Sequence, residues 1–235
     1  HAVVIGRDRQ CREDGDDRLP HDDAALAERL TPLGFAEPDA PVTPIQRCRD
    51  GSIRAFRSAP ARQALEDVLP GLMTAFGKAP DPMSALNRFD DMIARLPSAI
   101  NVFKLLAARP GLAEILAAIL CHAPTLAEAL SRRAELLDGL IDASAFDPMP
   151  SVEALAAQFS ALEPGEDYQS LLDRVRQRVG DRRFALGAQI IRGSSDPIEV
   201  AAGLSRVAEA ALETLASATI VEFERAHGRV PGGEL

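Results

Sequence analysis

The sequence predicts an all-α protein: a multi-helix bundle of short stacked helices with one long helix toward the C-terminal end. Apolar residues recur at spacings of three and four along most of the 235 residues, which is the period of a helix. No segment alternates between apolar and polar residues for long enough to indicate a strand. Hydrophobic residues make up 46% of the chain and aromatic residues only 4%, so the core must be mainly aliphatic. Such a composition favours closely packed helices.

The centre of the chain, residues 95–141, carries three look-alike phrases that predict a stack of short helices. Each phrase places two leucines four positions apart, on one helix face, with a carboxylate between them. The phrases are residues 110–116, 124–130 and 134–140. A proline opens the first two, at a position where its missing N–H is not needed. Three leucines of the stack are expected in the core: Leu116, Leu126 and Leu136.

In the N-terminal part, capping residues and prolines mark the expected helix ends. Asp22 is a candidate N-cap for a helix that stops near Gly34, and Asp81 precedes a proline that opens another helix. A helix starting at Pro60 is expected to be kinked at Pro70, because proline removes a helical hydrogen bond. Three further segments complete this part: a helix end at residues 1–10, a connector at 37–44 and a helix at 45–57.

The C-terminal part follows a proline-bearing break at residues 146–150. Ser151 is expected to open the next helix, and the helix after that is expected to end near Gly180. A short helix over residues 184–191 and a turn at Gly193 come next.

The longest element is expected to run from Pro197 to about His227, which is about 45 Å at the helical rise of 1.5 Å per residue. Gly228 is expected to end it. Its apolar residues predict one buried face, made of Val200, Leu204, Val207, Ala211 and Leu215.

Charge and cysteine content exclude several classes of function. The net charge is −9 and there are only two lysines, whereas a nucleic-acid surface needs clustered basic residues. No apolar run is long enough for a membrane span. We therefore expect no nucleic-acid partner and no membrane partner.

The cysteines are widely spaced without a CxxC motif, which indicates reduced thiols and a cytoplasmic location; they are Cys11, Cys48 and Cys121. Because the chain starts at His1 and ends abruptly at Leu235, we expect it to be cut from a longer polypeptide.

One motif suggests nucleotidyl transfer, the run Gly193-Ser194-Ser195-Asp196. Nucleotidyltransferases of the polymerase-β-like type place Gly-Ser before an Asp-x-Asp pair that holds magnesium. Here Pro197 follows Asp196, and the second aspartate is absent two places on. Glu199 lies three residues after Asp196, which is the spacing of a capping box. We therefore interpret Asp196 as a helix N-cap in preference to a metal ligand.

The remaining candidates for chemistry also have structural explanations. Cys121-His122 is an adjacent pair with no other cysteine or histidine near it in sequence, so a zinc site is not expected. His122 fits the C-terminal end of a helix better than a catalytic base. Two arginine pairs offer either an anion site or salt-bridge donors, and we favour the latter: Arg132-Arg133 and Arg182-Arg183. We predict no catalytic, cofactor-binding or metal-binding residue in this chain.

Residues 124–138, Pro-Thr-Leu-Ala-Glu-Ala-Leu-Ser-Arg-Arg-Ala-Glu-Leu-Leu-Asp, resemble the signature S-P-x-L-A-x-x-L-x-R-x-P-E-L-L-D of bacterial glutamine synthetase adenylyltransferase. Ala134 departs from it, since the signature has proline there. Other segments are similar to neighbouring parts of the same family: residues 89–97, 105–110, 182–187, 204–211 and 227–231. Residues 1–5, together with Arg9-Gln10 and Leu19-Pro20, resemble the last helices of its first catalytic half, but the acidic residues 11–17 depart from the family pattern.

The resemblance implies a bifunctional enzyme with two nucleotidyltransferase domains, one removing AMP from a glutamine synthetase tyrosine and one attaching it from Mg-ATP. Residues 1–96 would be the helical tail of the first, adenylyl-removing half, and residues 97–235 the helical lead-in to the second half. Glutamine synthetase and the PII signal protein would be the partners, with glutamine as a regulator. No catalytic residue of the family falls on this chain, so magnesium and ATP belong to the parent enzyme and the segment alone is expected to be inactive.

A different class of function stays open beside this one. Short stacked helices also build free-standing helical-repeat scaffolds that bind a partner in a groove. Because both ends of the chain look like cuts in a longer polypeptide, we favour the interdomain segment over the free-standing scaffold.

Overall fold

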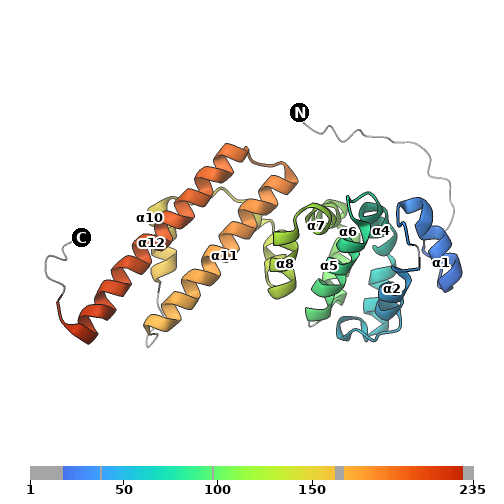
Figure 1. Ribbon diagram of the computed structural model, residues 1–235, viewed down its shortest axis with the longest axis horizontal. Helices are drawn as coiled ribbons and strands as arrows, with labels where there is room; N and C mark the ends of the chain where they lie inside the picture. Colours follow the sequence, from blue (N-terminus) through green and yellow to red (C-terminus); the bar gives the residue numbers. More distant parts are fainter. Residues whose placement is uncertain (1–17, 38, 97, 162–166, 230–235) are drawn as a thin grey trace.

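The computed structural model describes residues 18–37, 39–96, 98–161 and 167–229, and all regular structure within them is helical, so the all-α prediction is confirmed. The helices form an elongated row that begins with α1 and finishes with α10, α11 and α12 (Figure 1). In chain order the α-helices are α1 (Asp23–Leu30), α2 (Val42–Arg49), α3 (Ala59–Glu66), α4 (Leu69–Gly77), α5 (Pro82–Arg95), α6 (Ile100–Ala108), α7 (Pro110–His122), α8 (Pro124–Arg132), α9 (Leu136–Ile141), α10 (Val152–Ser160), α11 (Tyr168–Arg192) and α12 (Pro197–His227). Three short 3-10 helices lie between them: η1 (Thr31–Leu33), η2 (Arg54–Phe56) and η3 (Ser144–Phe146).

Local capping explains where several helices begin. The Asp22 carboxylate accepts a hydrogen bond from the Ala25 N–H at 3.0 Å, and the Asp81 carboxylate accepts one from the Ser84 N–H at 2.9 Å. Such bonds satisfy donors that have no partner inside the helix. Ser151 caps α10 in the same way, so all three predicted helix starts are confirmed. The predicted helix end at residues 1–10, and Cys11, lie outside the described residues.

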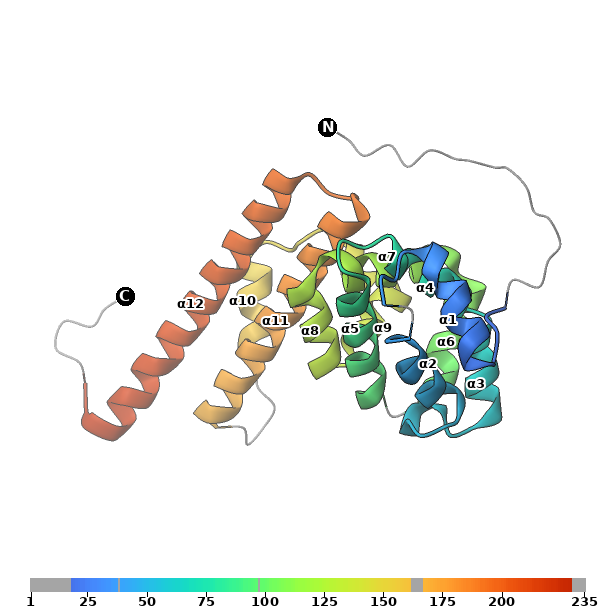
Figure 2. The same cartoon turned by 45° about the vertical axis from the view of Figure 1, so that its right-hand side comes forward.

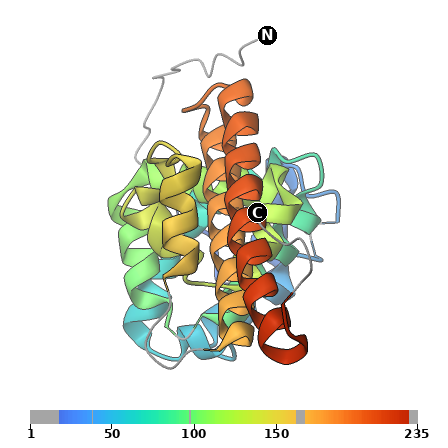
Figure 3. The same cartoon turned by 90° about the vertical axis from the view of Figure 1, so that its left-hand side faces the viewer.

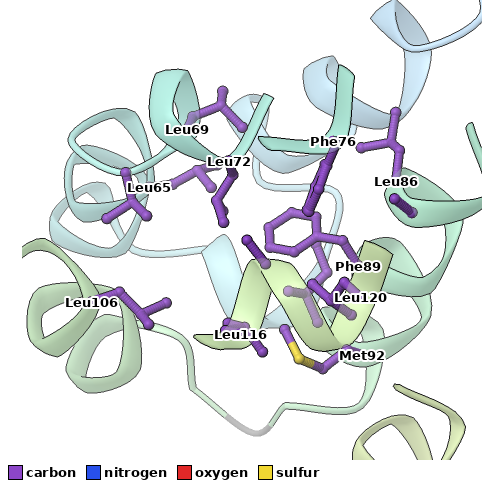
Figure 4. Packing of buried hydrophobic residues seen from close by; sticks show 14 of the residues in the cluster. Leu65, Leu69, Leu72, Phe76, Leu86, Phe89, Met92, Leu106, Leu116 and Leu120 are labelled. Carbon is purple, nitrogen blue, oxygen red and sulfur yellow. The ribbon is translucent and has the colours of Figure 1, made fainter. Parts of the chain in front are cut away.

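The larger of two hydrophobic clusters is built by α1 to α9 and receives one face of α11. Figure 4 shows leucines from α3, α4, α6 and α7 in the same cluster as Phe76 and Phe89. Ring centroids are 5.8 Å apart for Phe76 and Phe89, 6.0 Å for Phe89 and Phe103, and 5.1 Å for Phe103 and Phe56. These tilted and edge-on pairs are favourable geometries for aromatic rings. Aromatic residues are few, yet four of the nine phenylalanines meet in one place.

The central stack exists, with one residue misassigned. Leu116 has 0% and Leu136 has 8% of its surface exposed, so their burial is confirmed. Leu126 is only partly buried, and its side chain packs against α11 beside Gly187. The fully buried leucine of α8 is Leu130.

Along the described part of the chain, no single helix combines the length and apolarity needed to cross a membrane. Helices α7 and α8 meet that test only as a pair, and they are bent by 111° relative to each other.

The second cluster lies within α10, α11 and α12, which pack on one another at the C-terminal end of the row. Figures 2 and 3 show α12 running alongside α11 and α10. Helix α11 belongs to both clusters: Phe184 and Ala188 face the larger one, whereas Leu171, Val175 and Leu186 face the smaller.

Two expected helices in the N-terminal part have different bounds. The predicted helix at 45–57 is wrong, because α2 begins at Val42 and a turn at Gly51 (φ 78°) separates it from η2. The helix starting at Pro60 is not kinked at Pro70 but divided, since α3 ends at Glu66 and Pro70 lies in the first turn of α4. Proline is well accepted there, as no helical N–H is required.

Two expectations in the C-terminal part are also wrong. Gly180 does not end a helix, because α11 continues through it to Arg192 and joins the two predicted helices into one. A glycine inside a helix costs only about 1 kcal/mol, and the side chains that α11 buries in two clusters outweigh it. Leu204 is not in the buried face of α12, since it is 41% exposed. Gly203 takes that position, because a Cβ there would lie 2.9 Å from the Leu186 side chain.

Candidate functional site at the C-terminal end of helix α11

The run Gly193 to Asp196, which suggested nucleotidyl transfer, is a helix-to-helix turn. Gly193 has φ 69° and caps α11, a left-handed conformation that favours glycine. The Asp196 carboxylate accepts a hydrogen bond from the Ile198 N–H at 2.7 Å and opens α12. The interpretation of Asp196 as an N-cap is therefore confirmed. A carboxylate used in this way, without a second aspartate two places on, does not fit a magnesium-triphosphate site.

A buried glutamine holds this turn to the break that precedes α10. Gln189 is 4% exposed, and its Nε2 donates to the Ala145 carbonyl at 3.0 Å and to the Asp147 carbonyl at 3.1 Å. Its Oε1 accepts a hydrogen bond from the Ser195 hydroxyl at 3.0 Å. The amide is thus satisfied on both sides, as a buried polar group must be. The sequence alone does not reveal this role, because the carbonyl partners lie more than 40 residues away.

The predicted arginine pairs are divided among different contacts. Arg132 pairs with Glu128 at 2.5 Å and Arg133 with Asp181 at 2.5 Å, so both are confirmed as salt-bridge donors. Arg182 donates to the Gln158 side chain at 2.7 Å. Arg183 is exposed and lines a hollow of about 310 Å³ together with Arg132 and Arg133. Two of the three positive charges in that hollow are therefore balanced by carboxylates.

The two thiols in the described part of the chain, those of Cys48 and Cys121, are buried. Burial raises the pKa of Cys48 to about 12, with a smaller contribution from Asp90. Burial also raises the pKa of Cys121, whose thiol donates to the Ala75 carbonyl at 3.6 Å. Buried neutral thiols are poor nucleophiles. His122 is exposed in the last turn of α7, as predicted for a histidine at a helix C-terminus. Among residues 18–37, 39–96, 98–161 and 167–229 no group of three or more metal-ligating side chains gathers.

The outward side of α12 carries an uncharged stripe, which we call the α12 seam. Its members repeat at alternating spacings of three and four residues, the pattern that a helix uses to pack along another helix. They are Ile198, Ala201, Ser205, Ala208 and Leu212. Ile198 is 81% and Leu212 is 70% exposed, which is unusual for large apolar side chains. The seam therefore has the character of a docking surface.

The comparisons with known proteins identify the family. The model of the family described as glutamate-ammonia ligase adenylyltransferase matches residues 113–234. A bifunctional glutamine synthetase adenylyltransferase/adenylyl-removing enzyme of Mesorhizobium japonicum is 35% identical over 213 residues, and proteins of the same name from Agrobacterium fabrum and Rhizobium meliloti are 32% and 30% identical over 215 residues. The matches cover 90% to 91% of this chain but 22% of each relative's length. The chain thus belongs to the glutamate-ammonia ligase adenylyltransferase family.

Proposed function

We propose that this chain is a non-catalytic helical segment of a glutamine synthetase adenylyltransferase, which joins and orients the two nucleotidyltransferase domains and relays regulatory state between them. The observation that carries the proposal is the α12 seam. An exposed, uncharged stripe on a 31-residue helix needs a covering surface, and the relatives are more than four times as long as the part that this chain matches. The covering surface would be another part of the same polypeptide.

The proposal assigns residues 1–96 to the adenylyl-removing half and residues 97–235 to the lead-in of the adenylyltransferase half. The break at residues 147–151 and the division into two hydrophobic clusters support a change of packing in the C-terminal part. Residues on both sides of position 96 contribute to the larger cluster, and helix α11 connects this cluster to the smaller one.

The chemistry would take place elsewhere in the polypeptide. The substrate protein would be glutamine synthetase, which the relatives' names contain, and AMP would come from Mg-ATP bound by the catalytic domains. The PII signal protein would be the regulatory partner, and the cytoplasm the location. What supports an inactive segment is the use of Asp196 as a cap and the salt bridges of Arg132 and Arg133.

A transfer assay with radiolabelled ATP tests the catalytic part of the proposal. The isolated chain, incubated with glutamine synthetase, magnesium and labelled ATP, should leave glutamine synthetase unlabelled, while a full-length family member labels it under the same conditions. Labelling by the isolated chain would contradict the proposal.

A substitution in a full-length family member tests the docking part. Leu212→Asp places a charge in the α12 seam, and Val221→Asp is the matched control, because Val221 is 67% exposed on the same helix but lines a separate hollow between α10, α11 and α12. We expect Leu212→Asp to change the ratio of adenylylation to deadenylylation and Val221→Asp to leave it unchanged. Neither variant should lower the melting temperature of the isolated chain. Equal ratios in both variants would contradict a docking role for the seam.

A further inference from the structure

A groove beside the C-terminal end of α11 combines an apolar floor with two arginines. It has a volume of about 510 Å³ and lies between the start of α7, the end of α9, η3 and the last turn of α11. Its floor is made by partly buried or buried apolar side chains: Leu112, Ile115, Leu140, Ile141, Phe146 and Ile191. Arg109 and Arg192 line it as well. The volume is in the range of ligand-binding clefts.

Both guanidinium groups are held in place without being neutralised. Arg109 donates from Nη1 to the Ile141 carbonyl at 2.8 Å, and the Arg192 guanidinium lies 4.3 Å from the centre of the Phe146 ring. Within the described ranges, neither has a carboxylate within 4.0 Å, in contrast to Arg133 with Asp181. An arginine fixed by a carbonyl or an aromatic face keeps N–H donors free for an anion.

The charge and shape of the groove favour an acidic occupant. Glu114 is the one acid in the lining, which gives the groove a net charge of +1, from two arginines and one glutamate, on a chain of net charge −9. Gly111 leaves room at one end, because a Cβ there would meet no atom within 4 Å. A small inorganic anion would leave the apolar floor uncovered, and an apolar helix would leave both guanidinium groups without a partner.

We propose that this groove binds an acidic amphipathic peptide segment, whose apolar side chains cover the floor and whose carboxylates pair with Arg109 and Arg192. Grooves that take an amphipathic helix use this division between apolar anchors and charged edges, and carboxylates match the fork of N–H donors of a guanidinium group. The inference does not depend on the proposed function, because it concerns neither the α12 seam nor AMP transfer.

Selection from random peptides tests which chemistry the groove accepts. A phage library of random peptides of about 16 residues, some 24 Å long as helices, is selected on the chain after depletion on the double variant Arg109→Glu/Arg192→Glu. We expect clones rich in leucine, isoleucine or phenylalanine and in aspartate or glutamate. As soluble peptides in fluorescence anisotropy, they should bind the double variant about tenfold more weakly, as reversal of two exposed charges implies. Arg54→Glu, which changes an exposed arginine outside the groove, should bind like the unaltered chain.

A steric variant keeps the test decisive if charge reversal disturbs folding. Gly111→Trp fills the groove without changing either arginine and should abolish binding, with the helical circular dichroism retained. Gly71→Trp is the matched control, because a Cβ at Gly71 also meets no atom within 4 Å but lies outside the groove. Basic clones, an absence of enriched clones, or clones that still bind Gly111→Trp would each overturn the proposal.

Discussion

Replacement of Gly77 by alanine should destabilise the chain, because two backbone segments meet there without room for a methyl group. Gly77 ends α4 and lies against η1, and a Cβ at this position would lie 1.8 Å from the Leu33 carbonyl oxygen and 2.6 Å from its carbon. From the other side, a Cβ on Gly34 would lie 2.3 Å from the Gly77 carbonyl oxygen. Since the clashing atoms belong to the backbone, no change of rotamer can relieve them.

The cost follows from the movement that the methyl group requires. Carbon and oxygen need more than 3 Å, so η1 and α4 must separate by about 1 Å or more, and overpacking of this kind costs about 1–3 kcal/mol. Helix α1, which buries Leu26 and Leu30 beside η1, would move with it. Alanine gains roughly 0.5–1 kcal/mol over glycine in a helix, so we expect a net loss of about 1 kcal/mol. At a urea m-value of about 3 kcal/mol/M, the unfolding midpoint falls by about 0.3 M.

Gly71→Ala in the same helix is the control. A Cβ at Gly71 would meet no atom within 4 Å, so this variant should be more stable by roughly 0.5–1 kcal/mol. Urea unfolding followed by circular dichroism measures both. If the two variants shift the midpoint in the same direction, the close approach of α4 and η1 does not exist as described.

Three other predictions follow from burial and capping. Leu116→Ala should lower the free energy of unfolding by about 2–5 kcal/mol, and Leu126→Ala by clearly less, as urea titrations would show, because Leu116 is fully buried and Leu126 is not. Because the folded-state pKa of Cys48 is raised from 9.0 to about 12, its contribution to stability is complete below pH 9 and is lost between pH 9 and 12. Mass spectrometry at pH 8.5 should then find Cys48 alkylated by iodoacetamide only when urea is present. Asp196→Ala should reduce stability by roughly 0.5–2 kcal/mol through loss of the cap, and an unchanged melting temperature would contradict that role.

Local signals in the sequence predicted the helix starts, because capping depends on residues three or four positions apart. Asp22, Asp81 and Asp196 each lie where the sequence placed them. Some local signals for a helix end were wrong, because packing against residues distant in sequence has the larger effect on stability. Glycine is common at helix ends, yet α11 continues through Gly180, because residues on either side of it are buried against other helices.

One residue of the buried face of α12, Leu204, was mispredicted for a related reason, whereas Val200 and Val207 are buried as predicted. A ranking by hydrophobicity selects Leu204, whereas the interface uses Gly203, Ala210 and Thr214, whose small volume lets α12 approach its neighbours. Nor could the sequence reveal the groove, because Arg109 and Arg192 are 83 positions apart and meet the same hollow only after folding.

Helix α11 packs in both hydrophobic clusters, and this restricts the motions that it can transmit. Phe184 and Ala188 interlock with one set of helices while Leu171, Val175 and Leu186 interlock with another. A rotation of the helix by one residue, about 100°, would take all five side chains out of register at once, so twisting is opposed from both sides. A slow-exchanging stretch of amides should therefore span the overlap near residues 184–188. Any displacement that crosses the molecule through α11 should be a rigid translation or tilt of the whole rod.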